Sequence, residues 1–280
     1  MGYNSIKTEI QDRIAVLTLN RPTRLNSISR ELGSEMADFL AKLPNEDVNV
    51  LIVTGAARAD GRPCFSAGAD LKEMAEIGPM PLPRPDLIGA IEGLAALDPT
   101  EGTIQTLFDQ LESLPLFTIA AIDGVCTAGG IEIALCCDVR LVAETAQVSD
   151  MHLKNLGRPG GGGVTARLTR AVGPGWAKLM LCTCEPMDPQ ILSRIGFAQG
   201  VYAPDQLLTE ARKLAAKVAG MSKNGVRLTK ATVDATTDMT RKEALRFSYL
   251  CWAAGGGSSN TTGAQAFSEK RAADFSKSGV

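Results

Sequence analysis

Apolar residues follow two alternating spacings along the first two thirds of the chain. The stretch RIAVLTLNRP begins as a run of branched apolar residues and stops at a proline, which predicts a strand over 14–19 followed by a loop. The run VNVLIVTGA is apolar throughout and ends at glycine, as expected of a strand buried on both faces. The stretches LFTIAAIDG and DVRLVAE predict two further strands.

Helical spacing separates these strands. Between Ser29 and Leu43 the apolar positions are three or four residues apart, and Ser29 is the expected N-cap. A second helix is expected over 129–137. Alternating strands and helices predict an α/β protein with a mostly parallel sheet and helices on its faces.

Helical patterns dominate the C-terminal third. They predict helices over 176–182, 204–220, 225–234 and 241–254, and the stretch AGGGSSNTTGAQ is expected to break the chain before a last short helix ending at Phe275. Five prolines within 78–103 predict an irregular, mobile loop before a helix that starts at Ile104. We therefore expect a core over residues 1–200 and a helical subdomain over 201–280.

Composition narrows the class of partner. The 280 residues are 45% hydrophobic and carry a net charge of −2, which provides no overall field to attract nucleic acid or an anionic membrane. No apolar run approaches the ~20 residues of a membrane span, and no charged and apolar leader precedes MGYNSIKTEI. We expect a cytoplasmic protein whose partner is a small molecule.

The cysteines and the single histidine indicate no metal site. The seven cysteines form an odd number without Cys-x-x-Cys spacing, and His152 is the only histidine in the chain. Free thiols are usually buried, so we interpret the cysteines as core residues in a reducing compartment.

Two glycine-containing stretches provide candidate chemistry, CFSAGADLKEM (64–74) and DGVCTAGGIEIALCCD (123–138). Small residues at a corner between a strand and a helix expose backbone N–H groups at the positive end of the helix. Neither stretch has P-loop spacing, and no Gly-x-Gly-x-x-Gly follows the first predicted strand, which disfavours a nucleotide-binding Rossmann protein.

With NRPTRLNSI, RPGGGGVTARLTRAVG and AFSEKRAADF, these two stretches resemble the crotonase, or enoyl-CoA hydratase/isomerase, superfamily in order and approximate spacing. The resemblance implies a spiral of ββα units with a helical C-terminal trimerisation subdomain. It also implies acyl-CoA substrates, no cofactor other than the CoA of the substrate, and a homotrimer or dimer of trimers. The family's oxyanion hole matches the backbone N–H groups of Ala69 and Gly129.

The catalytic acids of the family match only in part. The hydratases use two glutamates, and Glu132 in GGIEIAL matches the first. Counting forward from Glu132 places the second on His152, whereas counting back from RLTRAVG places it on Leu153, and Asp150 lies nearby. A neutral imidazole can act as general base near neutral pH, so Glu132, His152 and Asp150 are the catalytic candidates.

Candidate substrate-binding residues follow from the same resemblance: Arg24, Ala67, Asp70, Leu71 and Lys270, with Lys270 reaching a neighbouring subunit in some members. Arg158, before the glycine run, is a candidate contact for a polar acyl group. We expect an enoyl-CoA hydratase. The missing second glutamate leaves open an isomerase, an acyl-CoA hydrolase, a C–C lyase or a non-catalytic CoA-binding protein.

Overall fold

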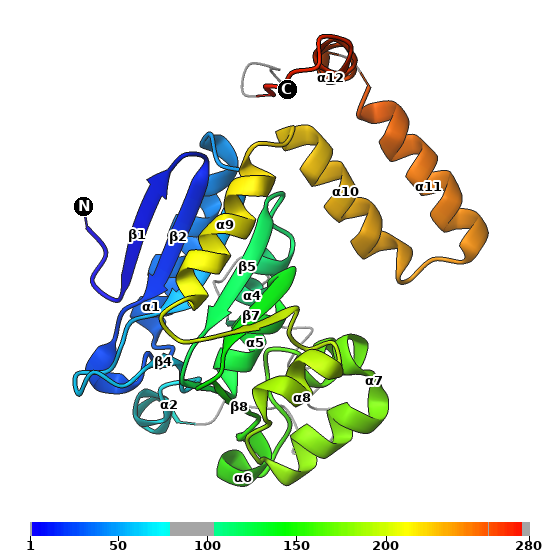
Figure 1. Cartoon of the computed structure of the whole chain (residues 1–280). Helices are drawn as coiled ribbons and strands as arrows, with labels where there is room; N and C mark the ends of the chain where they lie inside the picture. Colours follow the sequence, from blue (N-terminus) through cyan, green and yellow to red (C-terminus); the bar gives the residue numbers. More distant parts are fainter. Residues whose placement is uncertain (1, 79–103, 257, 276–280) are drawn as a thin grey trace.

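The computed structural model describes residues 2–78, 104–256 and 258–275. The predicted proline-rich loop lies almost wholly outside these residues. Figure 1 shows a central sheet covered by helices, with three C-terminal helices extending away from it.

Nine strands in the described residues form two sheets. The larger sheet has the order β1-β2-β3-β5-β7-β9, with β1 antiparallel to β2 and all other neighbours parallel. The smaller sheet has the order β4-β6-β8 and is parallel. The strands are β1 (Ile6–Gln11), β2 (Ile14–Leu19), β3 (Val50–Gly55), β4 (Cys64–Ser66), β5 (Phe117–Ile122), β6 (Val125–Thr127), β7 (Val139–Ala143), β8 (Gln147–Ser149) and β9 (Gly200–Tyr202).

From β3 onward, consecutive strands alternate between the two sheets. β3, β5 and β7 lie in the larger sheet, and each is followed by one strand of the smaller sheet and then by a helix. The chain therefore advances as a spiral of ββα units, which confirms the expected fold class. Each turn of the spiral brings a strand-to-helix corner to the same side of the molecule.

Both faces of the larger sheet are buried. α9 (Leu207–Ala219) covers one face, where Ala211, Ala215 and Ala219 allow close approach to the alternate strand residues Val50, Ile52 and their neighbours. The other face packs against α1 (Arg30–Lys42), α4 (Ile104–Glu112) and α5 (Gly129–Leu135). Burial on both sides explains the continuous apolar strand VNVLIVTGA.

The remaining helices complete the chain. α6 and α7 carry the loop that will form one wall of the site, and Figure 1 shows α6, α7 and α8 at the end of the molecule opposite α12. The bounds are η1 (Pro22–Arg24), η2 (Leu43–Asn45), α2 (Leu71–Ile77), α6 (His152–Leu156), α7 (Val164–Thr183), α8 (Pro189–Arg194), α10 (Lys223–Thr236), α11 (Arg241–Ala254) and α12 (Ser258–Ser268).

Two predicted helices differ from the structure. The helix expected over 176–182 belongs to the longer α7, which is kinked where Gly173 has a φ of 78° ahead of Pro174. The break expected over AGGGSSNTTGAQ was wrong, because α12 begins within it at Ser258 and ends at Ser268, before Phe275. The four consecutive glycines lie in the turn that precedes α7.

Residues beyond 200 belong to two different parts of the molecule. β9 and α9 pack against the larger sheet, whereas α10, α11 and α12 project from it (Figure 1). We call residues 223–268 the C-terminal arm. Among the described residues, no helix combines the length and the apolar character needed to cross a bilayer.

Candidate active site

A cavity of about 790 Å³ lies between α1, α2, α4, α5 and the loop that joins α6 to α7. Ala69 and Gly129 line it at the two strand-to-helix corners, and Glu132 and His152 line it beside them. The cavity therefore joins the two predicted backbone donors and two of the predicted catalytic side chains.

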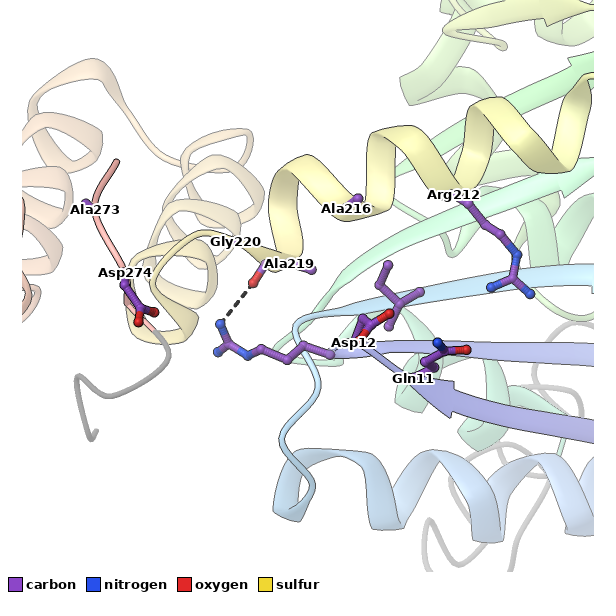
Figure 2. Close-up of a pocket in the computed structure, with 10 residues that line it drawn as sticks. Gln11, Asp12, Arg212, Ala216, Ala219, Gly220, Ala273 and Asp274 are labelled. Carbon is purple, nitrogen blue, oxygen red and sulfur yellow. Dashed lines mark hydrogen bonds between the residues drawn. The ribbon is translucent and has the colours of Figure 1, made fainter. Parts of the chain in front are cut away.

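A second hollow, of about 720 Å³, lies between the β1–β2 turn, the end of α9 and residues 273–274 (Figure 2). The two arginines that line it are engaged in structural bonds. Arg13 donates to the Ala219 carbonyl at 2.9 Å and pairs with Asp47 at 3.0 Å, and Arg212 pairs with Glu9 at 3.0 Å. Because the predicted backbone donors, Glu132 and His152 all line the first cavity, that cavity is the candidate site.

The two corners present free backbone amides. Ile28 and Ala69 form a parallel bridge in which Ile28 N–H donates to Gly68 O and Asp70 N–H donates to Ile28 O, so the Ala69 N–H is left for the cavity. Gly129 is the first residue of α5, where N–H groups have no partner within the helix. Neither amide donates to another described residue.

The backbone that orients each amide is unusual in the same way. Gly68 has a φ of 87°, and Ala128 has φ 50° and ψ −117°, which costs a non-glycine residue about 1–3 kcal/mol. A Cβ added to Gly68 would lie 2.8 Å from Gly129 N, and one added to Gly129 would lie 3.4 Å from Ala69 N. The two corners are therefore packed against each other, with their donors close together.

Glu132 is buried, with 2% of its surface exposed, one turn into α5. Its Oε1 accepts a hydrogen bond from Gly162 N–H at 2.8 Å. Burial raises the pKa of this carboxyl, and nearby His152 and the backbone N–H groups of Gly162 and Val164 offset only part of that rise. A carboxyl held in this way can keep a proton at a pH where exposed glutamates have lost it.

His152 faces Glu132 across the cavity. Its Nε2 lies 4.0 Å from Glu132 Oε2, and its Nδ1 lies 2.6 Å from Asp150 Oδ1. Burial alone would lower the pKa of His152, but the hydrogen bond and the charge of Asp150 outweigh it, so the pKa is raised. Asp150 thus favours a proton on Nδ1 and leaves Nε2 toward Glu132.

The glycine-rich loop closes over these side chains. A Cβ added to Gly160 would lie 2.6 Å from His152 Cε1 and 2.7 Å from Glu132 Oε1. One added to Gly162 would lie 2.1 Å from a ring carbon of Phe108. Glycine at both positions lets the backbone touch the two side chains directly.

His152 and Leu153, the two positions that the sequence offered as matches to the second glutamate, lie in different environments. The structure places His152 at Glu132, whereas Leu153 is 44% exposed and does not line the cavity.

The predicted substrate-binding residues all lie outside the lining of the cavity. Asp70 caps α2 and pairs with Arg21 at 2.9 Å, Leu71 is exposed, and Ala67 N–H donates to Leu25 O. Arg24 is exposed in η1, and Lys270 follows α12 at the end of the C-terminal arm. None of the five lines the cavity within one chain.

The sequence analysis missed one wall of the cavity, formed by α1. Arg30, Gly33, Ser34 and Ala37 line the cavity from a face of α1 distinct from its buried apolar face. Their spacing of three and four residues, with small side chains in three of the four positions, was the available signal.

No metal site is evident in the parts of the chain that the structure describes, where no three His, Cys, Asp or Glu side chains are arranged to hold an ion. The cavity places two backbone donors beside a carboxyl and an imidazole. This arrangement can stabilise a ligand oxygen that becomes negatively charged while protons are transferred nearby. Donors fixed in advance stabilise such an oxyanion strongly.

Comparison with known proteins identifies the family of this chain. The family model for enoyl-CoA hydratase/isomerase matches residues 9–278. A probable enoyl-CoA hydratase of Mycobacterium bovis is 32% identical over 277 residues, covering 98% of this chain and 99% of the relative. A crotonyl-CoA hydratase of Syntrophomonas wolfei is 33% identical over 282 residues, with the same coverage. The crystal structure of an enoyl-CoA hydratase from Bacillus anthracis matches with a TM-score of 0.83 at 28% identity, covering 98% of this chain and 99% of that one. The chain therefore belongs to the enoyl-CoA hydratase/isomerase family of the crotonase superfamily.

Proposed function

We propose that the protein is an enoyl-CoA hydratase that adds water across the 2,3 double bond of a 2-enoyl-CoA thioester. The observation that carries this proposal is the facing pair of Glu132 and His152, 4.0 Å apart beside two free amides in one cavity. The names of the relatives, which include enoyl-CoA and crotonyl-CoA hydratases, support it.

The backbone amides of Ala69 and Gly129 bind the thioester oxygen. As hydroxide adds to C3, electrons move through C2 to this oxygen, and the two N–H groups stabilise the resulting enolate. Losing one donor of such a hole typically costs about 3–4 kcal/mol of barrier. Neither donor is a side chain, so their position depends on the backbone at Gly68 and Ala128.

Glu132 and His152 carry out the proton transfers, and before water adds they hold one exchangeable proton between them, on Glu132. His152, neutral with its proton on Nδ1, accepts a proton from water through Nε2 as the oxygen bonds to C3. Glu132, protonated because of its burial, gives its proton to C2. The His152 imidazolium then returns a proton to Glu132 across the short gap between them, so the site is reset and one water has been consumed.

Isomerisation requires fewer proton-carrying groups than this site contains. One carboxyl can move a proton between C2 and C4, so a second proton-carrying group would have no task. The facing imidazole, fixed by Asp150 at 2.6 Å, is what favours hydration over isomerisation.

The remaining features of the proposal concern partners. The substrate is an acyl-CoA, and no cofactor is required beyond the CoA that it carries, since adding water involves no net redox change. We further propose a homotrimer or dimer of trimers, in the cytoplasm, in which Arg24 and the Lys270 of a neighbouring subunit contact the nucleotide end of CoA.

The test uses crotonyl-CoA and follows the loss of absorbance of the conjugated enone. We expect turnover by the wild type and a loss of roughly 10²–10⁴-fold in kcat for Glu132→Gln. Glu144→Gln, at an exposed glutamate, serves as the control and retains activity.

Two results would reject the proposal. Conversion of a 3-enoyl-CoA without any hydration of crotonyl-CoA would assign the site to an isomerase. Absence of any turnover with retained CoA-ester binding in both wild type and Glu132→Gln would indicate a non-catalytic binding protein.

A further inference from the structure

Arg158 is a solvent-exposed cation in the wall of the active-site cavity. It lines the cavity together with Glu132 and His152, and it forms no ion pair or hydrogen bond with another described residue. The other arginine in this wall is Arg30, whose backbone N–H donates to Glu73 Oε2 at 2.9 Å.

The backbone places Arg158 close to the reacting atoms. Gly157, with a φ of 64°, ends α6, and Pro159 restricts the residue before it to extended conformations. Gly160 then touches His152 and Glu132. Two residues of extended chain span at most about 7 Å, so the Arg158 side chain starts within that distance of Gly160. The charge of Arg158 also opposes protonation of His152.

The position of Arg158 determines which negatively charged part of an acyl-CoA can reach it: the phosphates of CoA or a group on the acyl chain. The phosphates of CoA are separated from the thioester by the whole pantetheine arm. A group that reaches Arg158 while C2 and C3 lie at Glu132 and His152 must therefore belong to the acyl chain, a few bonds beyond C3. Guanidinium groups pair with carboxylates through two parallel hydrogen bonds.

From this placement we infer that Arg158 is a specificity-determining residue that binds a terminal carboxylate of the acyl group. The preferred substrates are then thioesters of short unsaturated dicarboxylic acids. The inference rests on the proposed function for its view of where C2 and C3 lie, and it adds to that proposal the chemical class of the acyl group.

The kinetic test compares glutaconyl-CoA with 2-pentenoyl-CoA, which has the same five acyl carbons without the carboxylate. In the wild type we expect kcat/KM to be at least about tenfold higher for glutaconyl-CoA. Arg158→Met should abolish this preference by lowering kcat/KM far more for glutaconyl-CoA than for 2-pentenoyl-CoA, and Arg158→Lys should retain part of the preference. The control is Lys154→Met, which removes an exposed cation of α6 that does not line the cavity.

A binding test keeps this inference separate from the proposed reaction. Calorimetry with glutaryl-CoA and pentanoyl-CoA, which are saturated and cannot be hydrated, should show tighter binding of glutaryl-CoA in the wild type and equal binding in Arg158→Met. If enoyl thioesters are not hydrated but this preference exists, the hydratase proposal fails and the inference stands.

Two results would overturn the inference. One is hydration and binding without preference for the carboxylate. The other is an equal loss on both enoyl thioesters in Arg158→Met, which would assign the arginine to the electrostatic environment of His152 instead.

Discussion

Three ionisable side chains share one buried cluster in this protein. Glu132 and Asp150 are each 2% exposed and His152 is 8% exposed, so each must be stabilised by its neighbours or remain neutral. The Asp150–His152 bond provides one such pairing, and the Gly162 N–H provides a donor for Glu132. Because the Glu132–His152 pair is coupled, its titration belongs to both groups together.

Asp150→Asn is expected to shift the pH dependence of hydration. Asp150 raises the pKa of His152, and a raised pKa means that the imidazole becomes neutral, and able to act as a base, only at higher pH. Without the carboxylate, the acidic limb of the kcat/KM profile should move to lower pH. The maximal rate should also fall, by roughly 10²-fold or more, because the Nδ1–H form is no longer favoured. An unchanged acidic limb in a profile measured with crotonyl-CoA would contradict this role of Asp150.

Glu132→Gln is expected to stabilise the fold at high pH while it removes activity. Burial raises the pKa of Glu132 in the folded protein, so stability falls as pH rises from the unfolded pKa near 4.5 through the folded pKa. Glutamine has no charge to bury and can still accept from Gly162. Its advantage should therefore be absent below about pH 4 and greatest in mildly alkaline solution. There, each kcal/mol gained raises Tm by roughly 2 °C.

Thermal unfolding of Glu132→Gln at acidic and alkaline pH checks this sign. Glu144→Gln, with an exposed side chain, should show no comparable difference between the two pH values. A Glu132→Gln protein less stable than wild type at alkaline pH would mean that the charge is more stabilising than its burial is costly.

At the scale of elements, the loop between α6 and α7 is held by α7 itself. The guanidinium of Arg167 in α7 donates to the Gly162 carbonyl, and it bonds Asp109 at 2.9 Å and Glu112 at 2.6 Å on α4. The N–H of the same Gly162 donates to Glu132. Arg167 therefore connects α4 and α7 to the backbone that positions the Glu132 carboxyl, and it does not line the cavity itself.

Arg167→Met is expected to lower kcat by roughly tenfold to a hundredfold with a smaller change in KM, because a small displacement of a catalytic group is costly. Losing the Gly162 donor should raise the pKa of Glu132 further, so the basic limb of the rate profile should move to higher pH. Arg167→Lys should restore part of the rate. Arg170→Met on the same helix removes an exposed ion pair with Asp238 and should change neither limb. If both variants behave alike, Arg167 supports only the general stability of α7.

Elements of this fold differ in how far the sequence determines them. The strand Ile14–Leu19 and the helix Arg241–Ala254 were predicted with their observed bounds, and Ser29 caps α1 as expected through the Leu32 N–H. These elements have a complete local signal. The three-residue strands β4, β6 and β8 have none, because they are defined by pairing with one another across long sequence separations.

The residues of the candidate site also differ in how far the sequence alone predicts them. Resemblance in sequence predicted Glu132, Ala69 and Gly129 as site residues, but it could not choose between His152 and Leu153, since one residue of loop length changes the match. In the structure the loop backbone at Gly160 packs on the His152 imidazole, whereas Leu153 is exposed. The sequence did not predict the α1 wall, because polar residues on a helix surface give the same sequence pattern whether they face solvent or a cavity.

At the scale of the whole molecule, the C-terminal arm exposes large apolar side chains. Leu245, Tyr249 and Trp252 are 44%, 65% and 79% exposed, and their spacing of four and three residues places them on one face of α11. α10 and α11 pack against each other but project from the sheet (Figure 1). Aromatic side chains of this size favour burial in an interface.

Replacing Trp252 with glutamate is therefore expected to dissociate the proposed oligomer. A charge at a position that becomes buried between subunits carries a large desolvation penalty, whereas in a monomer it would remain in water at no cost. Sedimentation or light scattering should show a trimer or hexamer for the wild type and smaller species for Trp252→Glu, with the circular dichroism spectrum retained. The control is Ile10→Glu, at a 47% exposed position on β1 away from the arm. Since the proposed contact of Lys270 with CoA comes from a neighbouring subunit, the smaller species should also bind acyl-CoA more weakly. A wild type that sediments as a monomer would reject the proposed assembly and, with it, the role assigned to Lys270.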